Sequence, residues 1–147
     1  MLIETKYLGE LSIKEEQVIQ FPDGLPGFPD ETQYILLELP GNPVFNILQS
    51  IHTKDIAFIV TSPYHFYATY AFNLSQSIIE KLQIETESDV DVLTIVTLAN
   101  PFSKSTINLK APLILNIKKQ YGKQYILNDT DYPIKAPITT LQKVKGE

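Results

Sequence analysis

Ser50, His52 and Asp55 are the residue types of a hydrolytic triad, in which a base activates a hydroxyl nucleophile and a carboxylate orients the base. They fall within six positions of one another, a spacing that arises often by chance. Ser50 also lacks the flanking glycines of a nucleophile elbow. We therefore predict that the protein is not an enzyme, and a small hydrolase using these three residues is the alternative interpretation.

Metal and cofactor chemistry finds few suitable residues. The chain has two histidines and no cysteine, and His65 lies among aromatic residues with no second imidazole nearby. Two acidic groups resemble calcium ligands but lack the glycine and distal glutamate of a helix-loop-helix site. These groups are Asp89 with Asp91, and Asn128 with Asp129 and Asp131. No lysine follows the glycines of residues 24–27, as a phosphate loop would require. We predict no metal, no cofactor and no catalytic residue.

Protein recognition is the chemistry that remains, and two segments could provide it. Five aromatic residues crowd into residues 64–72; core packing would explain them, but one or two exposed rings could anchor an interface. Further along, four carboxylates occupy alternate positions: Glu85, Glu87, Asp89 and Asp91. An extended backbone would point all four to one side. We interpret this acidic ladder either as a solvated face or as a docking face for a basic protein.

Composition bounds the class of protein. The chain has 147 residues, 44% of them hydrophobic and 20% charged, which suits one domain that buries roughly two-thirds of its unfolded surface. The net charge is −5, and all twelve basic residues are lysine, so no guanidinium group is available to grip phosphate or guanine. We predict no direct nucleic-acid partner. The eight lysines after residue 100 leave a direct RNA-binding module as a further alternative.

Targeting signals are not evident. The first twenty residues alternate charged and apolar types and contain no apolar core of a signal peptide. No apolar run approaches the ~20 residues of a membrane-spanning helix. The absence of cysteine is compatible with a reducing compartment. We expect a cytoplasmic protein without a membrane partner.

Alternation of apolar and polar residues predicts strands along most of the chain. Residues 55–61 are apolar on both faces, as in a central strand. The predicted strands are residues 2–7, 10–14, 17–21, 32–39, 44–51, 55–61, 91–99, 106–111, 113–119 and 124–127, with a turn at residues 121–123. One short helix is predicted near residues 74–83, capped by Asn73 or Ser75. The expected fold is all-β and mainly antiparallel, a barrel-like or sandwich-like single domain over residues 1–132, followed by a C-terminal tail at 133–147.

Several blocks of sequence, in order, resemble those of the flagellar assembly factor FliW family. The most specific is Phe-Pro-Asp-Gly-Leu-Pro-Gly-Phe at residues 21–28. The others are Leu-Gln-Ser-Ile at 48–51, Ala-Phe-Ile-Val at 57–60, Asn-Leu-Lys-Ala-Pro-Leu-Ile-Leu-Asn at 108–116 and Gly-Lys-Gln at 122–124. Their order and spacing extend over nearly the whole chain, which makes the resemblance strong.

The resemblance implies a non-enzymatic cytoplasmic regulator with a barrel-like β fold. Proteins of this family bind newly made flagellin near its C-terminal segment, and alternatively bind the translational repressor CsrA. By binding CsrA, the factor would relieve repression of flagellin messenger RNA; abundant flagellin would then occupy the factor and release the repressor. A disordered flagellin segment could dock as an amphipathic helix or as an added strand, and the sequence favours neither.

The resembling blocks themselves have two interpretations. Residues 21–28 and 108–116 could serve chiefly as scaffold, because their prolines, glycines and asparagines suit turns and caps. Alternatively, Leu25, Phe28 and Asn108 could belong to a peptide-binding groove. We therefore carry seven candidate protein-binding residues forward: Leu25, Phe28, Glu85, Glu87, Asp89, Asp91 and Asn108.

Overall fold

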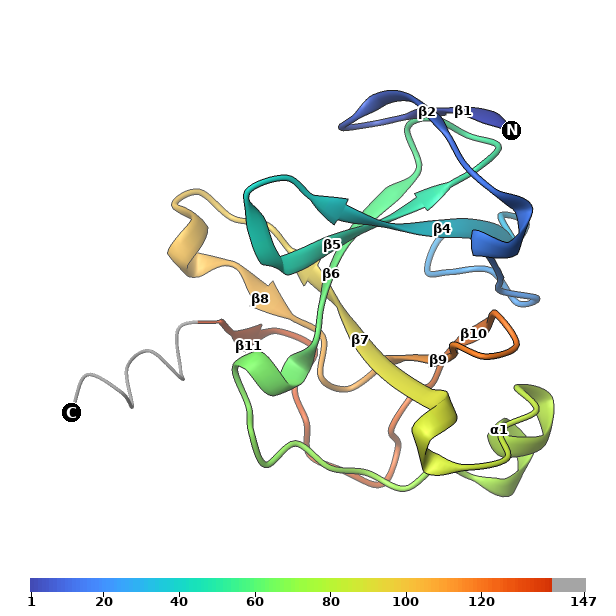
Figure 1. The fold of residues 1–147 in the computed structure, drawn as a ribbon. Helices are drawn as coiled ribbons and strands as arrows, with labels where there is room; N and C mark the ends of the chain where they lie inside the picture. The colour runs from blue at the N-terminus through green and yellow to red at the C-terminus, as the bar shows by residue number, and fades with distance from the viewer. Residues whose placement is uncertain (139–147) are drawn as a thin grey trace.

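A computed structural model describes residues 1–138 of the chain, and its centre is a closed β-barrel (Figure 1). The barrel strands are, in spatial order, β7 (Val90–Thr97), β6 (Ala57–Thr61), β5 (Asn42–Ser50), β4 (Gln33–Leu39), β3 (Val18–Gln20), β10 (Tyr121–Gln124) and β9 (Leu113–Asn116). Pairing of β9 back onto β7 closes the ring. Closure removes the free sheet edges that an open sheet of this size would expose.

All pairings in the described barrel are antiparallel except β3 with β10, which is parallel and rests on a single residue pair, Gln20 with Tyr121. Strand β6 lies between β5 and β7, which confirms the central position that its two apolar faces predicted. The predicted all-β, mainly antiparallel fold is therefore confirmed, and of the two architectures expected the structure has the barrel.

Short elements decorate the barrel. The second half of β7 pairs with β8 (Thr106–Ile107), and β8 pairs with β11 (Ala136–Pro137). The predicted N-terminal hairpin is present as β1 (Leu2–Thr5) and β2 (Gly9–Ser12). Four 3-10 turns connect strands: η1 (Glu15–Gln17), η2 (Pro63–His65), η3 (Glu87–Asp89) and η4 (Phe102–Lys104).

The barrel interior is filled by side chains from the strands and from the loop that follows β3. Phe21, Leu48 and Val60 are completely buried there. A second cluster lies where β8 and β11 extend the sheet, and it includes Ile107, Leu127 and Ile138. This packed interior fixes the positions from which the surface segments project.

The predicted helix is confirmed as α1 (Gln76–Lys81), shorter than the pattern suggested. Of the two candidate caps the structure uses Ser75, whose Oγ accepts a hydrogen bond from the N–H of Ile78 at 3.3 Å. Ile78 and Leu82 are buried against Ile114 of β9, so the helix covers one end of the barrel. None of the helices within residues 1–138 has the length and hydropathy needed to cross a bilayer.

Two sequence predictions are corrected by the fold. Residues 121–123 were predicted as a turn, but they belong to β10; the chain reverses before them, where Gln120 adopts a positive φ of 59°. Part of the tail predicted from residue 133 belongs to the fold, because β11 pairs with β8 and Ala136 and Ile138 are buried. Prolines at 133 and 137 suggested a fraying end, but burial of the apolar residues around them decided the outcome. The rest of the predicted tail lies outside the described residues.

Candidate protein-binding groove

An open groove of about 640 Å³ lies at the end of the barrel next to α1. One wall is the stretch from Tyr70 to Leu74, which joins η2 to α1, and the other runs from Ile84 to Glu87. The first residues of β7 line it between these walls. The structure therefore brings the aromatic segment and the acidic segment, which sequence analysis considered separately, to the same hollow.

The first wall is apolar and is built by rings packed on one another. The centroid of Tyr70 lies 5.4 Å from that of Phe72 and 4.6 Å from that of Tyr132. Tyr70 is buried, and its hydroxyl donates to the carbonyl of Leu109 at 2.6 Å. Burial raises the pKa of this hydroxyl far above its ordinary value, so it stays protonated and keeps the bond. Tyr70 thus belongs to the core, and Phe66, Tyr67 and Phe72 pack half-buried against it. Tyr64 is exposed at the groove.

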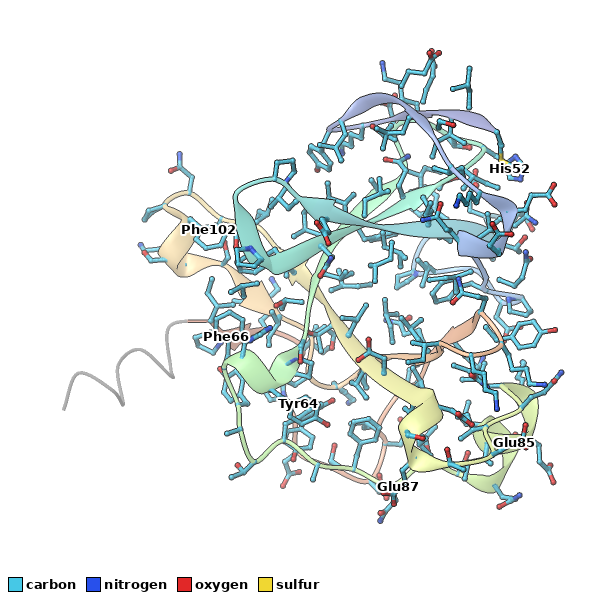
Figure 2. The ribbon with its side chains drawn as sticks, viewed as in Figure 1. His52, Tyr64, Phe66, Glu85, Glu87 and Phe102 are labelled. Atoms are coloured by element: carbon cyan, nitrogen blue, oxygen red, sulfur yellow. The ribbon has the colours of Figure 1, made fainter. Side chains whose placement is uncertain are left out.

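The second wall is acidic, although the ladder that the sequence predicted does not exist. Residues 87–89 form the turn η3 instead of an extended strand, so the four carboxylates do not share one side. Glu85, Glu87 and Asp91 are exposed and line the groove. Figure 2 shows Glu85 and Glu87 below the barrel, on the same side of the molecule as Tyr64.

Asp89 is the residue that bends this segment. Its side chain is 8% exposed, and its Oδ2 accepts hydrogen bonds from the N–H groups of Thr86 and Glu85, each at 3.1 Å. These bonds lower the pKa of the Asp89 carboxyl. Asp89 is therefore not exposed beside its acidic neighbours as the ladder predicted: its carboxylate caps the turn that presents them.

Leu25, Phe28 and Asn108 lie outside the groove. Leu25 is buried in the barrel core, and Phe28 is 40% exposed with its ring packed edge-on against Phe58. Asn108 accepts hydrogen bonds through Oδ1 from the N–H groups of Lys110 and Ala111, at 3.1 and 3.0 Å. These contacts agree with the scaffold interpretation of the two blocks, since each residue holds its own loop in shape.

Ser50, His52 and Asp55 do not form the hydrogen bonds of a triad. Ser50 is fully buried, and its Oγ donates to a carboxylate oxygen of Glu31 at 2.8 Å. The Nε2 of His52 lies 2.6 Å from the side-chain oxygen of Gln33. Within residues 1–138, no hydrogen bond joins the side chains of Ser50, His52 and Asp55 to one another. Nor do the described residues contain a cluster of three or more His, Asp or Glu side chains placed to hold a metal ion.

Comparison with known proteins agrees with this description. Residues 2–138 match the protein family described as FliW protein. The chain belongs to the FliW family. It is 48% identical to the flagellar assembly factor FliW of Oceanobacillus iheyensis over the full length of both chains, and 48% identical to that of Bacillus subtilis over 94% of this chain and 96% of the other. A crystal structure of the flagellar assembly factor FliW superposes with a TM-score of 0.89 at 40% identity, covering 94% of this chain and 96% of that one.

As a member of the FliW family, this chain is a flagellar assembly factor, and the resemblance found in the sequence blocks is confirmed. Those blocks lie mostly in the scaffold. Sequence analysis missed the tyrosines that hold the groove wall, Tyr125 and Tyr132, whose hydroxyls bond the main chain of residues 71–75. Nothing local marks them, because their partners lie 50 or more residues away in the chain.

Proposed function

We propose that this chain is a non-enzymatic, cytoplasmic regulator of flagellar assembly that binds flagellin and, alternatively, the translational repressor CsrA. Flagellin would dock through its C-terminal segment. When flagellin is scarce, the protein would hold CsrA and relieve repression of flagellin messenger RNA. When flagellin accumulates, it would take the protein from CsrA and restore repression.

The observation that supports this proposal is the division of the groove into an apolar wall and an acidic wall. Half-buried Phe72 and Leu74 on one side offer apolar surface to an amphipathic segment. Glu85, Glu87 and Asp91 on the other side offer negative charge to a basic partner. Within residues 1–138, the two ion pairs of the structure join Asp23 to lysines, so these three carboxylates stay free to meet a partner's charge.

Exchange of partners at one groove needs no chemistry beyond mutual exclusion. Two partners that share a surface compete, and each occupies it according to its concentration relative to its dissociation constant. Because flagellin varies in abundance during assembly, the occupant of the groove would report the flagellin level. The proposal therefore requires that flagellin weaken CsrA binding, and that CsrA weaken flagellin binding by the same factor.

A charge-reversal variant tests the proposal. We expect E85K, E87K and D91K together to slow association with CsrA about tenfold or more at low ionic strength and to flatten its salt dependence, because steering by these carboxylates is lost. Association rates can be measured by surface plasmon resonance at salt concentrations from about 50 to about 300 mM, a range over which screening of charges increases strongly. The slower association and the flatter salt dependence should both appear in these measurements.

The matched control is a variant with the same change of net charge at a distant surface. Glu4 and Glu10 face each other across the N-terminal hairpin, and Asp55 is exposed in the loop before β6. Replacement of these three residues by lysine should leave the CsrA association rate much closer to that of the original protein. Equal slowing by both variants would attribute the effect to net charge alone and would remove the groove from the proposal.

A further inference from the structure

The apolar wall of the groove contains an extended stretch of chain that belongs to no sheet. Residues 71–75 lack regular secondary structure, and their side chains alternate between exposed and half-buried: Ala71, Asn73 and Ser75 are exposed, and Phe72 and Leu74 are half-buried. Ser75 has extended backbone angles, φ −69° and ψ 155°. In Figure 1 this stretch runs along the lower edge of the molecule into α1. Alternation of this kind is the burial pattern of a surface strand.

One edge of this stretch is occupied by tyrosine hydroxyls. The Tyr132 hydroxyl accepts from the N–H of Ala71 at 3.1 Å and donates to the carbonyl of the same residue at 3.0 Å. The Tyr125 hydroxyl accepts from the N–H of Ser75 at 3.2 Å and lies 3.5 Å from the carbonyl of Asn73. The two side chains therefore bond the main chain where a neighbouring strand would.

The tyrosines bond every second residue of the stretch, and this spacing tells which main-chain groups face the opposite edge. In an extended chain the N–H and C=O of one residue point to the same edge, and those of the next residue point to the opposite edge. Residues 71, 73 and 75 point to the tyrosines, so the main-chain groups of Phe72 and Leu74 point away from them. Among residues 1–138, no hydrogen bond is made by the N–H or C=O of Phe72 or Leu74.

This open edge lies on the groove side. The whole stretch from Tyr70 to Leu74 lines the groove, whereas Tyr125 and Tyr132, which hold its other edge, do not. Across the groove stand Glu85 and Glu87. A chain laid in the groove would therefore have main-chain donors and acceptors on one flank and carboxylates on the other.

We propose that the groove recognises its partner by strand addition: an extended peptide pairs with the main chain of Phe72 and Leu74. The side chains of the peptide would alternate: apolar ones would pack against the half-buried side chains of Phe72 and Leu74, and basic ones would point toward Glu85 and Glu87. Charge complementarity with the acidic wall selects this occupant over an acidic or purely apolar peptide. The inference rests on the proposed function and adds how the flagellin segment is read: through its main chain, as a strand and not as a helix.

The experiment uses the full-length protein and the shortest piece of the flagellin C-terminal segment that still binds it. Each backbone N–H of that peptide is methylated in turn, which removes one donor and leaves every side chain intact. We expect the dissociation constant to rise about tenfold at every second position and less than about twofold at the positions between, because only alternate residues of an added strand pair with the edge.

Variants of the protein test the same edge from the other side. L74P and L74A both remove the leucine side chain, but only L74P also removes the N–H that faces the groove. L74P should bind the peptide about tenfold more weakly than L74A. Amide hydrogen exchange provides a measurement without mutation: the peptide should slow exchange at Phe72 and Leu74 and leave Asn73 nearly unchanged.

The outcomes separate the two proposals. Weakened binding at consecutive methylated positions would indicate a helical occupant, and binding insensitive to methylation would indicate recognition by side chains alone; either overturns strand addition and leaves the proposed function standing. If no part of the flagellin segment binds the protein, the proposed function fails and this inference fails with it.

Discussion

Two stretches of the chain, residues 21–28 and residues 71–75, lie outside the regular helices and strands, and they are held in opposite ways. The loop at residues 21–28 is braced by itself: the N–H of Gly24 bonds the carbonyl of Phe21 at 2.8 Å, and the N–H of Phe28 bonds that of Leu25 at 2.8 Å. The groove wall at residues 71–75 is held by Tyr125 and Tyr132, which lie 50 and 61 residues further along the chain from the residues they bond.

The difference distinguishes a loop that is bonded to itself from the proposed binding surface. The braced loop forms three main-chain hydrogen bonds within itself and inserts Phe21 into the barrel, where the ring lies 5.5 Å from that of Tyr34. It has little left to offer a partner. The groove wall uses only one of its edges within the fold, so the other remains available. When distant side chains bond only one edge of a segment, the segment is ordered while the main-chain N–H and C=O groups of its other edge keep no partner. Recognition of a peptide main chain requires both properties.

Among the substitutions that test this difference, we expect the largest loss of stability at Gly24 in the braced loop. Its φ is +69°, and a Cβ there would lie 2.3 Å from the carbonyl oxygen of Phe28. G24A should therefore suffer both the strain of a left-handed backbone and a clash with main chain that cannot move without breaking the brace. We expect a loss of about 3 kcal/mol or more in the free energy of unfolding, measured in urea.

Gly27 is the matched control for this variant. It lies in the same loop with a similar φ of +82°, but a Cβ there would meet nothing within 4 Å. G27A should cost about 1 kcal/mol, the strain alone. Equal losses for the two variants would mean that the loop relaxes freely around residue 24, and the picture of a rigid, self-braced scaffold would be wrong.

The acidic wall of the groove also contains one residue that holds the backbone and one that faces solvent. Asp89 caps its turn, whereas the carboxylate of Glu87, two residues before it, is exposed and makes no hydrogen bond or ion pair within residues 1–138. D89A should lower the melting temperature by about 2–4 °C, because two main-chain N–H groups lose their acceptor. E87A should leave the melting temperature unchanged and slow CsrA association instead.

These two single variants dissociate stability from binding. Calorimetric melting and association rates are measured on both proteins at the same salt concentration. Two results would contradict the assigned roles: E87A lowering the melting temperature as much as D89A does, or D89A alone slowing association. Either would mean that Asp89 does not act in the turn and Glu87 does not act at the surface.

Sequence analysis found the braced loop and most of the strands because their causes are local. Pro22, Gly24 and Gly27 restrict the backbone where they stand, and alternation along residues 55–61 depends on adjacent positions only. The acidic ladder failed for a related reason: alternating carboxylates predict a strand, but Asp89 can satisfy N–H groups three and four residues earlier, and that bonding competes with extension.

The groove wall could not be predicted in the same way. The pattern around residues 71–75 predicted only the start of a helix near residue 74, not an extended segment. The tyrosines that order the stretch, Tyr125 and Tyr132, come from the region after β10. Only the closed barrel brings Tyr132 to Ala71. Segments whose partners are distant in sequence form the proposed binding surface, and local sequence patterns describe such segments least.

The smallest effect is expected where the two regions are joined. Asp23, in the braced loop, accepts hydrogen bonds through Oδ2 from Lys81 of α1 and Lys123 of β10, each at 2.6 Å. The bonds to Lys123 and Lys81 lower the pKa of the Asp23 carboxyl from 3.8 to about 2. A carboxyl whose pKa is lower in the folded state stabilises the protein above its unfolded pKa, and this contribution is lost as the pH falls from about 4 through 2.

D23N should remove that contribution while keeping the side chain's shape. Because the Asp23 side chain is 48% exposed, solvent screens both pairs, and the loss at neutral pH should be about 1 kcal/mol at most. The difference in unfolding free energy between D23N and the original protein should shrink as the pH is lowered from 5 to 2, and it should also shrink in about 1 M salt. A difference that persists at pH 2 would show that the amide disturbs packing, and that loop, helix and strand are joined here by shape more than by charge.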